Sequence, residues 1–125
     1  MKLFSVEEAN ALLPAVRRIV TAISRAHTTT ISFQEASRRA AAGAESGGGH
    51  MPEGMKYVMT LLNLVQHTNE LEELGVQLKD YERGLIDFPT MRDGRIVLLC
   101  WKLDEGDQLE WWHEVEAGFA GRQPL

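Results

Sequence analysis

Residues 84–101 read GLIDFPTMRDGRIVLLCW, and this stretch decides the fold of the 125-residue chain. The dipeptide Asp93-Gly94 lies between two runs that are rich in Ile, Val, Leu and Phe. A two-residue hairpin turn of type I′ needs a positive φ at both central residues, and Asp-Gly is one of the pairs that adopt it. The stretch therefore predicts an antiparallel β-hairpin that turns at Asp93 and Gly94.

The turn also predicts the register of the two strands. Counting outward from a two-residue turn pairs Arg92 with Arg95 beside the turn and Ile86 with Trp101 at the far end. Because successive side chains point to opposite faces of a strand, one face of the hairpin becomes apolar and is predicted to be buried. Its residues are Ile86, Phe88, Val97, Leu99 and Trp101.

The first part of the chain, residues 5–75, predicts a helical hairpin. Ser5 and Glu8 have the spacing of a capping box, so a helix is expected to begin at about Val6. A second helix is expected from about Pro52 to Gly75, where a glycine can form a left-handed cap. The glycine-rich segment 43–52 predicts a loop between the two helices.

The remaining residues, 76–125, predict a small sheet and a third helix. Residues 76–80 form a further strand-like run before the hairpin. A short C-terminal helix that carries His113 and ends at Gly118 is expected, and the tail 119–125 is expected to be irregular. The residues that suggest this helix recur at helical spacing: Leu109, Trp112 and Glu116.

The expected fold class is therefore α+β, in a single domain of residues 1–125. A long N-terminal helical hairpin packs with a small antiparallel β-hairpin or three-stranded sheet and with a short C-terminal helix.

Composition and charge limit the classes of function. Lys and Arg number 13 against 18 Asp and Glu, which leaves a formal net charge of −5. This acidic balance argues against nucleic-acid binding, which needs a basic surface. The single cysteine, Cys100, cannot form an internal disulfide, as is typical of the reducing cytoplasm. No apolar run is long enough for a membrane span, so we expect a cytoplasmic protein that binds neither nucleic acid nor membrane.

Several distinctive short motifs are spread along nearly the whole chain. The N-terminal stretch, residues 3–14, reads LFSVEEANALLP. The C-terminal half carries Gly75-Val76, Leu78-Lys79-Asp80, Gly84-Leu85, Asp87-Phe88-Pro89, Leu99-Cys100-Trp101, Trp112-His113 and Gly121-Arg122. Together these motifs resemble the bacterial family known only as domain of unknown function 2203 (DUF2203). The resemblance implies a recurrent bacterial domain and brings no established activity.

Five residues of the C-terminal half have the chemistry of metal ligands: Asp80, Glu82, Asp87, Cys100 and His113. Carboxylate, thiolate and imidazole bind zinc, and several carboxylates near one imidazole also suit iron or manganese. The hairpin register places Asp87 opposite Cys100, with β-carbons about 4.5 to 5.5 Å apart. Asp80 and Glu82 lie in the preceding turn, and the third helix would have to fold back to bring His113. The sequence thus predicts a divalent-metal or small-ligand site between the β-hairpin and the C-terminal helix.

Each of these residues also has a purely structural interpretation. Asp80 and Glu82 can form a turn, Cys100 can act as a small buried apolar residue, and His113 can bond a backbone carbonyl at the edge of the core. The sequence contains no standard zinc or calcium motif. Cys100 and His113 could also pair as nucleophile and base, but burial in an apolar strand would raise the thiol pKa and oppose that reaction.

Two classes of function stay open, and the sequence does not decide whether the protein is an enzyme. The favoured class is a protein that binds a divalent metal or a small ligand, with hydrolysis as a candidate reaction. The alternative is a non-catalytic interaction module whose helical hairpin self-associates, because the apolar stripes of the helices exceed what one small sheet can cover. The same stripes predict a homodimer.

Overall fold

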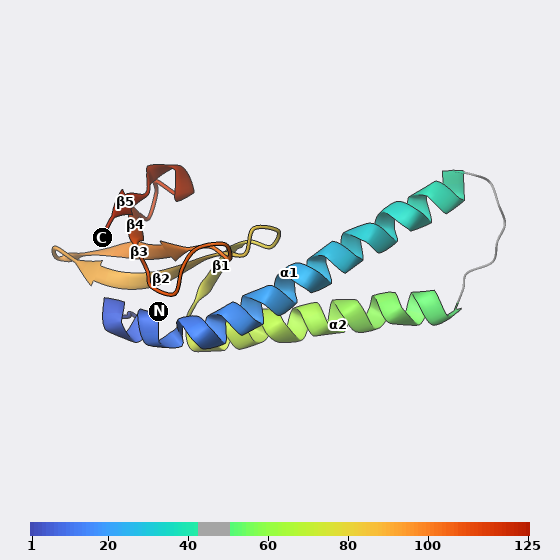
Figure 1. Ribbon diagram of the computed structural model, residues 1–125, viewed down its shortest axis with the longest axis horizontal. Coiled ribbons are helices and arrows are strands. Elements are labelled where there is room, and N and C mark those ends of the chain that lie inside the picture. Colours follow the sequence, from blue (N-terminus) through green and yellow to red (C-terminus); the bar gives the residue numbers. More distant parts are fainter. Residues whose placement is uncertain (43–50) are drawn as a thin grey trace.

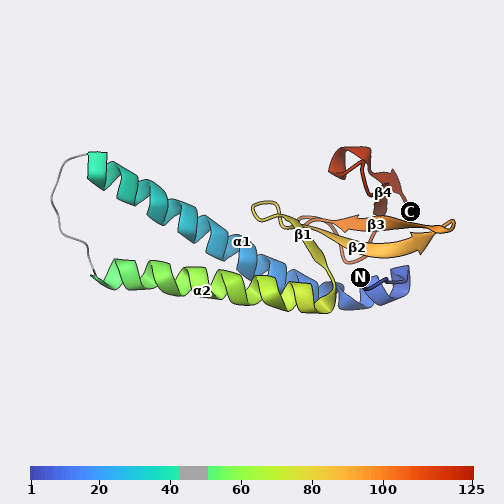
Figure 2. The same ribbon diagram turned by 180° about the vertical axis from the view of Figure 1, so that it is seen from behind.

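Two antiparallel helices and one β-sheet make up the computed structural model (Figures 1 and 2). Helix α1 spans Val6–Ala42 and helix α2 spans Met51–Leu74. The structure describes residues 1–42 and 51–125, so residues 43–50 of the predicted loop 43–52 lie outside the described residues, and its last two residues belong to α2. The described residues confirm an α+β chain that begins with a helical hairpin.

The predicted start of α1 and the predicted end of α2 are both confirmed by local hydrogen bonds. The backbone N–H of Ser5 donates to Glu8 Oε1 over 2.8 Å, and the backbone N–H of Glu8 donates to Ser5 Oγ over 3.0 Å. These bonds satisfy two amide groups that a helix N-terminus would leave unpaired. After α2, Gly75 has a φ of 87° and its N–H donates to the carbonyl of Glu72 over 2.9 Å. The chain then turns directly into the sheet.

The sheet has five antiparallel strands in sequence order. The strands are β1 (Gln77–Asp80), β2 (Leu85–Arg92), β3 (Arg95–Trp101), β4 (Trp111–Glu114) and β5 (Gln123–Pro124). The sequence predicted the first three of these strands, and the sheet is therefore larger than expected.

The β2–β3 hairpin has the predicted turn and the predicted register. Asp93 has a φ of 50° and Gly94 a φ of 79°, as a type I′ turn requires. Pairing continues in the predicted register from the turn as far as Ile86 and Trp101. All five residues of the predicted apolar face are buried in the core.

The predicted third helix is wrong, because residues Trp111–Glu114 form strand β4 beside β3. Trp112 belongs to the core, whereas His113 contacts Asp87 on the other face, so the side chains alternate as in a strand. Aromatic residues favour a pleated, half-buried surface, and pairing with β3 satisfies the backbone of this segment. Leu109 and Glu116 lie outside the strand, so their helical spacing with Trp112 is coincidental.

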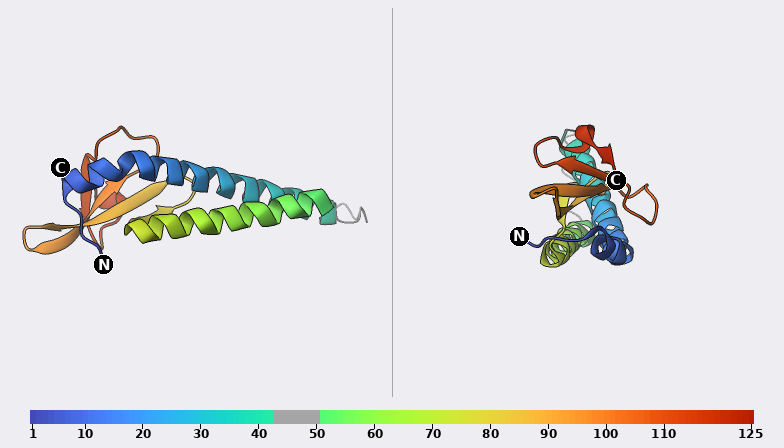
Figure 3. Two further views of the ribbon diagram at one scale, coloured as in Figure 1. Left: turned by 90° about the horizontal axis from the view of Figure 1, so that it is seen from below. Right: turned by 90° about the vertical axis from the view of Figure 1, so that its left-hand side faces the viewer.

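The predicted irregular tail is also wrong. Residues Phe119–Gly121 form a 3-10 turn, η1, and Gln123–Pro124 pairs with β4 as strand β5. The tail therefore covers an edge of β4 that would otherwise be open. Both η1 and β5 lie at the edge of the sheet that is far from the helices (Figures 1 and 3).

The main core lies between the two helices and one face of the sheet (Figure 3). Its fully buried apolar side chains come from α1, α2 and the central strands, and include Leu13, Val16, Val20, Ile23, Leu71, Ile86, Phe88, Val97, Leu99 and Trp101. Among the described residues, no helix has the length and apolar character to cross a membrane. The opposite face of the sheet holds a smaller set of buried polar residues.

Candidate metal centre

Three side chains with metal-ligand chemistry meet on the sheet face away from the helices. Asp87 on β2 pairs directly with Cys100 on β3, and His113 on β4 pairs with Leu98, two residues from Cys100 and on the same face. All three residues are buried, with at most 2% of their surface exposed. One ligand atom from each lies within 4.8 Å of the other two. Strand pairing therefore assembles this triad of Asp87, Cys100 and His113, and the expected delivery of His113 by a helix is wrong.

The imidazole of His113 makes two contacts that define its orientation. Nδ1 lies 2.7 Å from the backbone oxygen of Glu114, and since a carbonyl can only accept, Nδ1 carries a proton and donates it. Nε2 lies 3.1 Å from Asp87 Oδ1. In a neutral ring Nε2 then has a lone pair, so it can face a carboxylate oxygen through a shared proton or through a cation that both atoms bind.

Burial controls the protonation of the other two members of the triad. Burial raises the pKa of Asp87, and the charge of the nearby His113 opposes this change. Burial and the negative charge of Asp87 raise the pKa of the Cys100 thiol to about 12. Without a metal ion, Cys100 is therefore a neutral thiol at neutral pH, which does not favour its use as a free nucleophile.

Arg122 is a half-buried cation close to the triad that the sequence did not single out as a site residue. Its guanidinium lies 4.8 Å from the ring centroid of Trp111, which pairs with Cys100, and 4.6 Å from that of Phe119. Its Nη2 donates to Glu105 Oε2 over 2.6 Å, while its buried Nε has no hydrogen-bond partner in the described part of the chain. The charge of Arg122 lowers the thiol pKa, although burial and Asp87 outweigh it.

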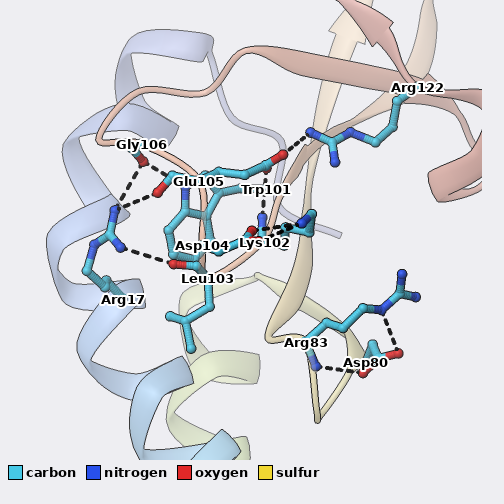
Figure 4. A network of polar contacts seen from close by, with 10 residues as sticks. All are labelled: Arg17, Asp80, Arg83, Trp101, Lys102, Leu103, Asp104, Glu105, Gly106 and Arg122. Carbon is cyan, nitrogen blue, oxygen red and sulfur yellow. Dashed lines mark hydrogen bonds and ion pairs between the residues drawn. The ribbon is translucent and has the colours of Figure 1, made fainter.

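Asp80 and Glu82, the other two predicted ligands, lie outside the triad. Asp80 binds Arg83 instead, accepting its backbone N–H over 2.9 Å and lying 3.2 Å from its Nε (Figure 4). The hydrogen bond from the Arg83 backbone lowers the pKa of Asp80. Glu82 is exposed in the β1–β2 turn, where its carbonyl accepts the hydroxyl of Ser24 over 3.2 Å. Their role in turn formation, which the sequence left open, accounts for both positions.

A polar network connects α1 with the loop between β3 and β4. Arg17 of α1 donates to the backbone oxygens of Leu103, Glu105 and Gly106 over 3.1 to 3.3 Å (Figure 4). The indole N–H of Trp101 donates to the Gly106 oxygen over 2.9 Å. Because Glu105 also binds Arg122, the network connects α1, the loop and the C-terminal tail.

Two signals in the sequence could have located β4 and Arg122. The alternation of Trp112 and His113 between a large apolar and a polar side chain has the period of a strand. Gly121-Arg122 is one of the motifs that carry the family resemblance. The motif draws attention to Arg122 but does not predict that it lies near Cys100. That position depends on pairing between β4 and β5, which no local pattern predicts.

A sequence model of one protein family, described as "Uncharacterized conserved protein (DUF2203)", matches residues 2–125. No curated protein and no solved structure matches the chain. The expected family is thus confirmed over essentially the full length of the chain.

Proposed function

We propose that this chain, which belongs to the family of uncharacterised conserved proteins DUF2203, binds one divalent metal ion at Asp87, Cys100 and His113. The observation that carries the proposal is the orientation of the His113 ring. Metal-bound histidines usually donate their second ring N–H to a carboxylate or a backbone carbonyl, which fixes the tautomer and directs the free nitrogen at the ion. Nδ1 of His113 makes such a bond to Glu114, and Nε2 points toward the carboxylate of Asp87.

Zinc is the ion that this set of ligands favours. Nitrogen, sulfur and oxygen are all common zinc ligands, whereas manganese prefers oxygen, and iron is the second candidate. Zinc bonds of about 2.0 to 2.3 Å place the ligand atoms of a tetrahedral site roughly 3.3 to 3.8 Å apart. The distance of 3.1 Å between His113 Nε2 and Asp87 Oδ1 is close to that range.

Three protein ligands leave one coordination position for water or a small ligand. Zinc-bound water is a nucleophile near neutral pH, which is why hydrolysis is the candidate reaction. However, all three side chains are buried, so a substrate reaches the ion only after local opening of this face of the sheet. We therefore place metal binding first and treat hydrolysis as an activity that depends on it.

A cytoplasmic location suits this proposal. A thiolate ligand has to stay reduced, and Cys100 is the one cysteine in the sequence. The acidic net charge of −5 is compatible with cation binding and not with binding to nucleic acid.

The test compares the triad with a carboxylate outside it. We expect elemental analysis of protein purified without a metal-affinity tag to find one ion per chain in the parent and in Asp80→Asn. Asp87→Asn, Cys100→Ala and His113→Ala should each lose it. Titration with Co²⁺ should give a thiolate-to-metal absorption band in the parent that is absent from Cys100→Ala.

Chelation provides a second readout of the same proposal. A ligand present at about 100 times its dissociation constant adds roughly 2.7 kcal/mol to the stability of the folded state. A chelator should therefore lower the unfolding temperature of the parent and of Asp80→Asn, but hardly that of Asp87→Asn. If all three proteins respond alike, the triad is a structural hydrogen-bonded cluster and the metal proposal fails.

A further inference from the structure

Helix α2 has two apolar seams on different sides. The inner seam follows spacings of four and three residues and is half-buried or buried, and it consists of Tyr57, Leu61, Leu64, Thr68 and Leu71. It faces α1, since Tyr57 stacks on Phe33 with ring centroids 4.4 Å apart and Leu71 belongs to the core. The outer seam consists of Met55, Val58, Leu62 and Val65.

The outer seam has the pattern of a helix-packing surface, and no other described residue of the same copy covers it. Its residues are 48% to 59% exposed, and the neighbouring Met59 is 51% exposed. Their spacings of three, four and three residues are those of the a and d positions of a coiled coil. Apolar residues in such a row are expected to bury their surface against another helix.

The far half of the helical hairpin depends on such cover more than the rest of the molecule does. Beyond Thr30, the described residues of α1 include no buried side chain as far as Ala42. This part of the hairpin projects away from the sheet as a two-helix arm (Figures 1 and 3). Two helices alone enclose little core, whereas helices of two hairpins together can form a bundle.

For a second copy as the missing helix, the charges on α2 favour the antiparallel over the parallel direction. Glu53 and Lys56 lie near the N-terminus of α2, and Glu70, Glu72 and Glu73 lie near its C-terminus, where the last turn contains no basic residue. Glutamates at a helix C-terminus are unfavourable in the field of the helix dipole. A parallel copy would place its three glutamates beside those of the first copy, whereas an antiparallel copy keeps the two acidic ends apart.

We propose that two copies of this chain associate through the outer seam of α2, with the two α2 helices antiparallel. The a and d positions then alternate across the interface, so that Met55 of one copy packs against Val65 of the other and Val58 against Leu62. The same surface serves both copies, as a two-fold interface requires. This interface is separate from the triad and goes beyond the proposed metal binding.

A membrane surface is a poorer occupant of the outer seam. Amphipathic helices that bind membranes carry Lys and Arg beside their apolar face. Among the described side chains of α2, Lys56 is the one basic residue, against three glutamates. If the outer seam instead bound a membrane or a different protein, the purified chain would be monomeric in solution.

Analytical ultracentrifugation at micromolar concentration tests the interface. The parent should sediment at twice the 14.0 kDa of one chain. Leu62→Glu places two unpaired charges in the seam and should raise the dissociation constant by about 100-fold or more, giving a monomer. Asn63→Glu adds the same charge to an exposed position beside the seam, so it should stay a dimer. Leu62 is 56% exposed, so its replacement leaves the fold of one copy intact.

Cross-linking tests the direction of the helices. In a mixture of Val58→Cys and Leu62→Cys, oxidation should link one variant to the other and should not link either to itself. The native Cys100 is buried and does not compete. A monomeric parent, a dimer that Leu62→Glu leaves unchanged, or self-linked Val58→Cys would each overturn the proposal.

Discussion

His113 and Asp87 share one proton when no metal ion lies between them. Nδ1 of His113 uses its own proton for the Glu114 carbonyl, so one further proton is needed in the 3.1 Å contact between Nε2 and Asp87 Oδ1. Cys100 adds a second proton, because burial keeps the thiol neutral. A divalent cation replaces both protons at once, and this exchange links metal affinity to pH.

Metal binding is therefore expected to release about two protons near neutral pH. The contact between His113 Nε2 and Asp87 Oδ1 holds one proton, and the raised thiol pKa of about 12 keeps the second on Cys100 in the metal-free fold. Higher pH removes their competition, and the apparent affinity should rise roughly 100-fold per pH unit. Calorimetric titration with Zn²⁺ in buffers of different ionisation enthalpy measures the number released. An affinity that does not change with pH would contradict the assignment of Cys100 and His113 as ligands.

The β2–β3 hairpin can be tested by a substitution in the turn that sets its register. Gly94 has a φ of 79° and no neighbouring atom within 4 Å of an added Cβ, so a substitution there acts through the backbone alone. Gly94→Val should destabilise the protein by about 1 to 3 kcal/mol, because a β-branched residue is strained at positive φ. Denaturant unfolding measures the loss. Gly106→Val is the matched control, since Gly106 also has no atom within 4 Å of an added Cβ but lacks a positive φ. The stability of this variant should hardly differ from that of the parent.

This hairpin could be predicted because its signals are local. Asp93 and Gly94 set the turn, and the alternation of apolar residues on either side sets the register that pairs Asp87 with Cys100. Strands β4 and β5 have four and two residues, and they are stable as strands through pairing with β3 and with each other. Such pairing is not encoded in a short stretch of sequence, so a helical spacing around Trp112 was equally plausible.

The same limit explains which of the predicted site residues the structure brings together. The hairpin register predicts that Asp87 and Cys100 are neighbours. The chemistry of His113 suggests a ligand, but strand β4, and not a helix, brings it beside them. Asp80 and Glu82 were included because they are carboxylates near the hairpin. Whether a carboxylate faces a site or its own turn depends on contacts such as the one between Asp80 and Arg83, which the sequence does not reveal.

The whole molecule combines two units with different chemistry. The triad lies on the sheet face away from the helices, and the outer seam lies on the exposed side of α2, which extends along the projecting arm (Figures 1 and 3). The main core and the network around Arg17 join the sheet to α1. No described hydrogen bond connects a residue of the outer seam with a residue of the triad.

Metal binding and dimer formation should therefore be independent. Sites that lie well apart and share no partners usually contribute additively to stability, within about 0.5 kcal/mol. Monomeric Leu62→Glu should keep the parent's metal content per chain, and Asp87→Asn should stay dimeric in the ultracentrifuge. The double variant should show both losses and, at equal chain concentration, a destabilisation equal to the sum of the two. Loss of the ion on dissociation would instead mean that the second copy supports the triad, and the missing coordination position would then have to be sought at the interface between copies.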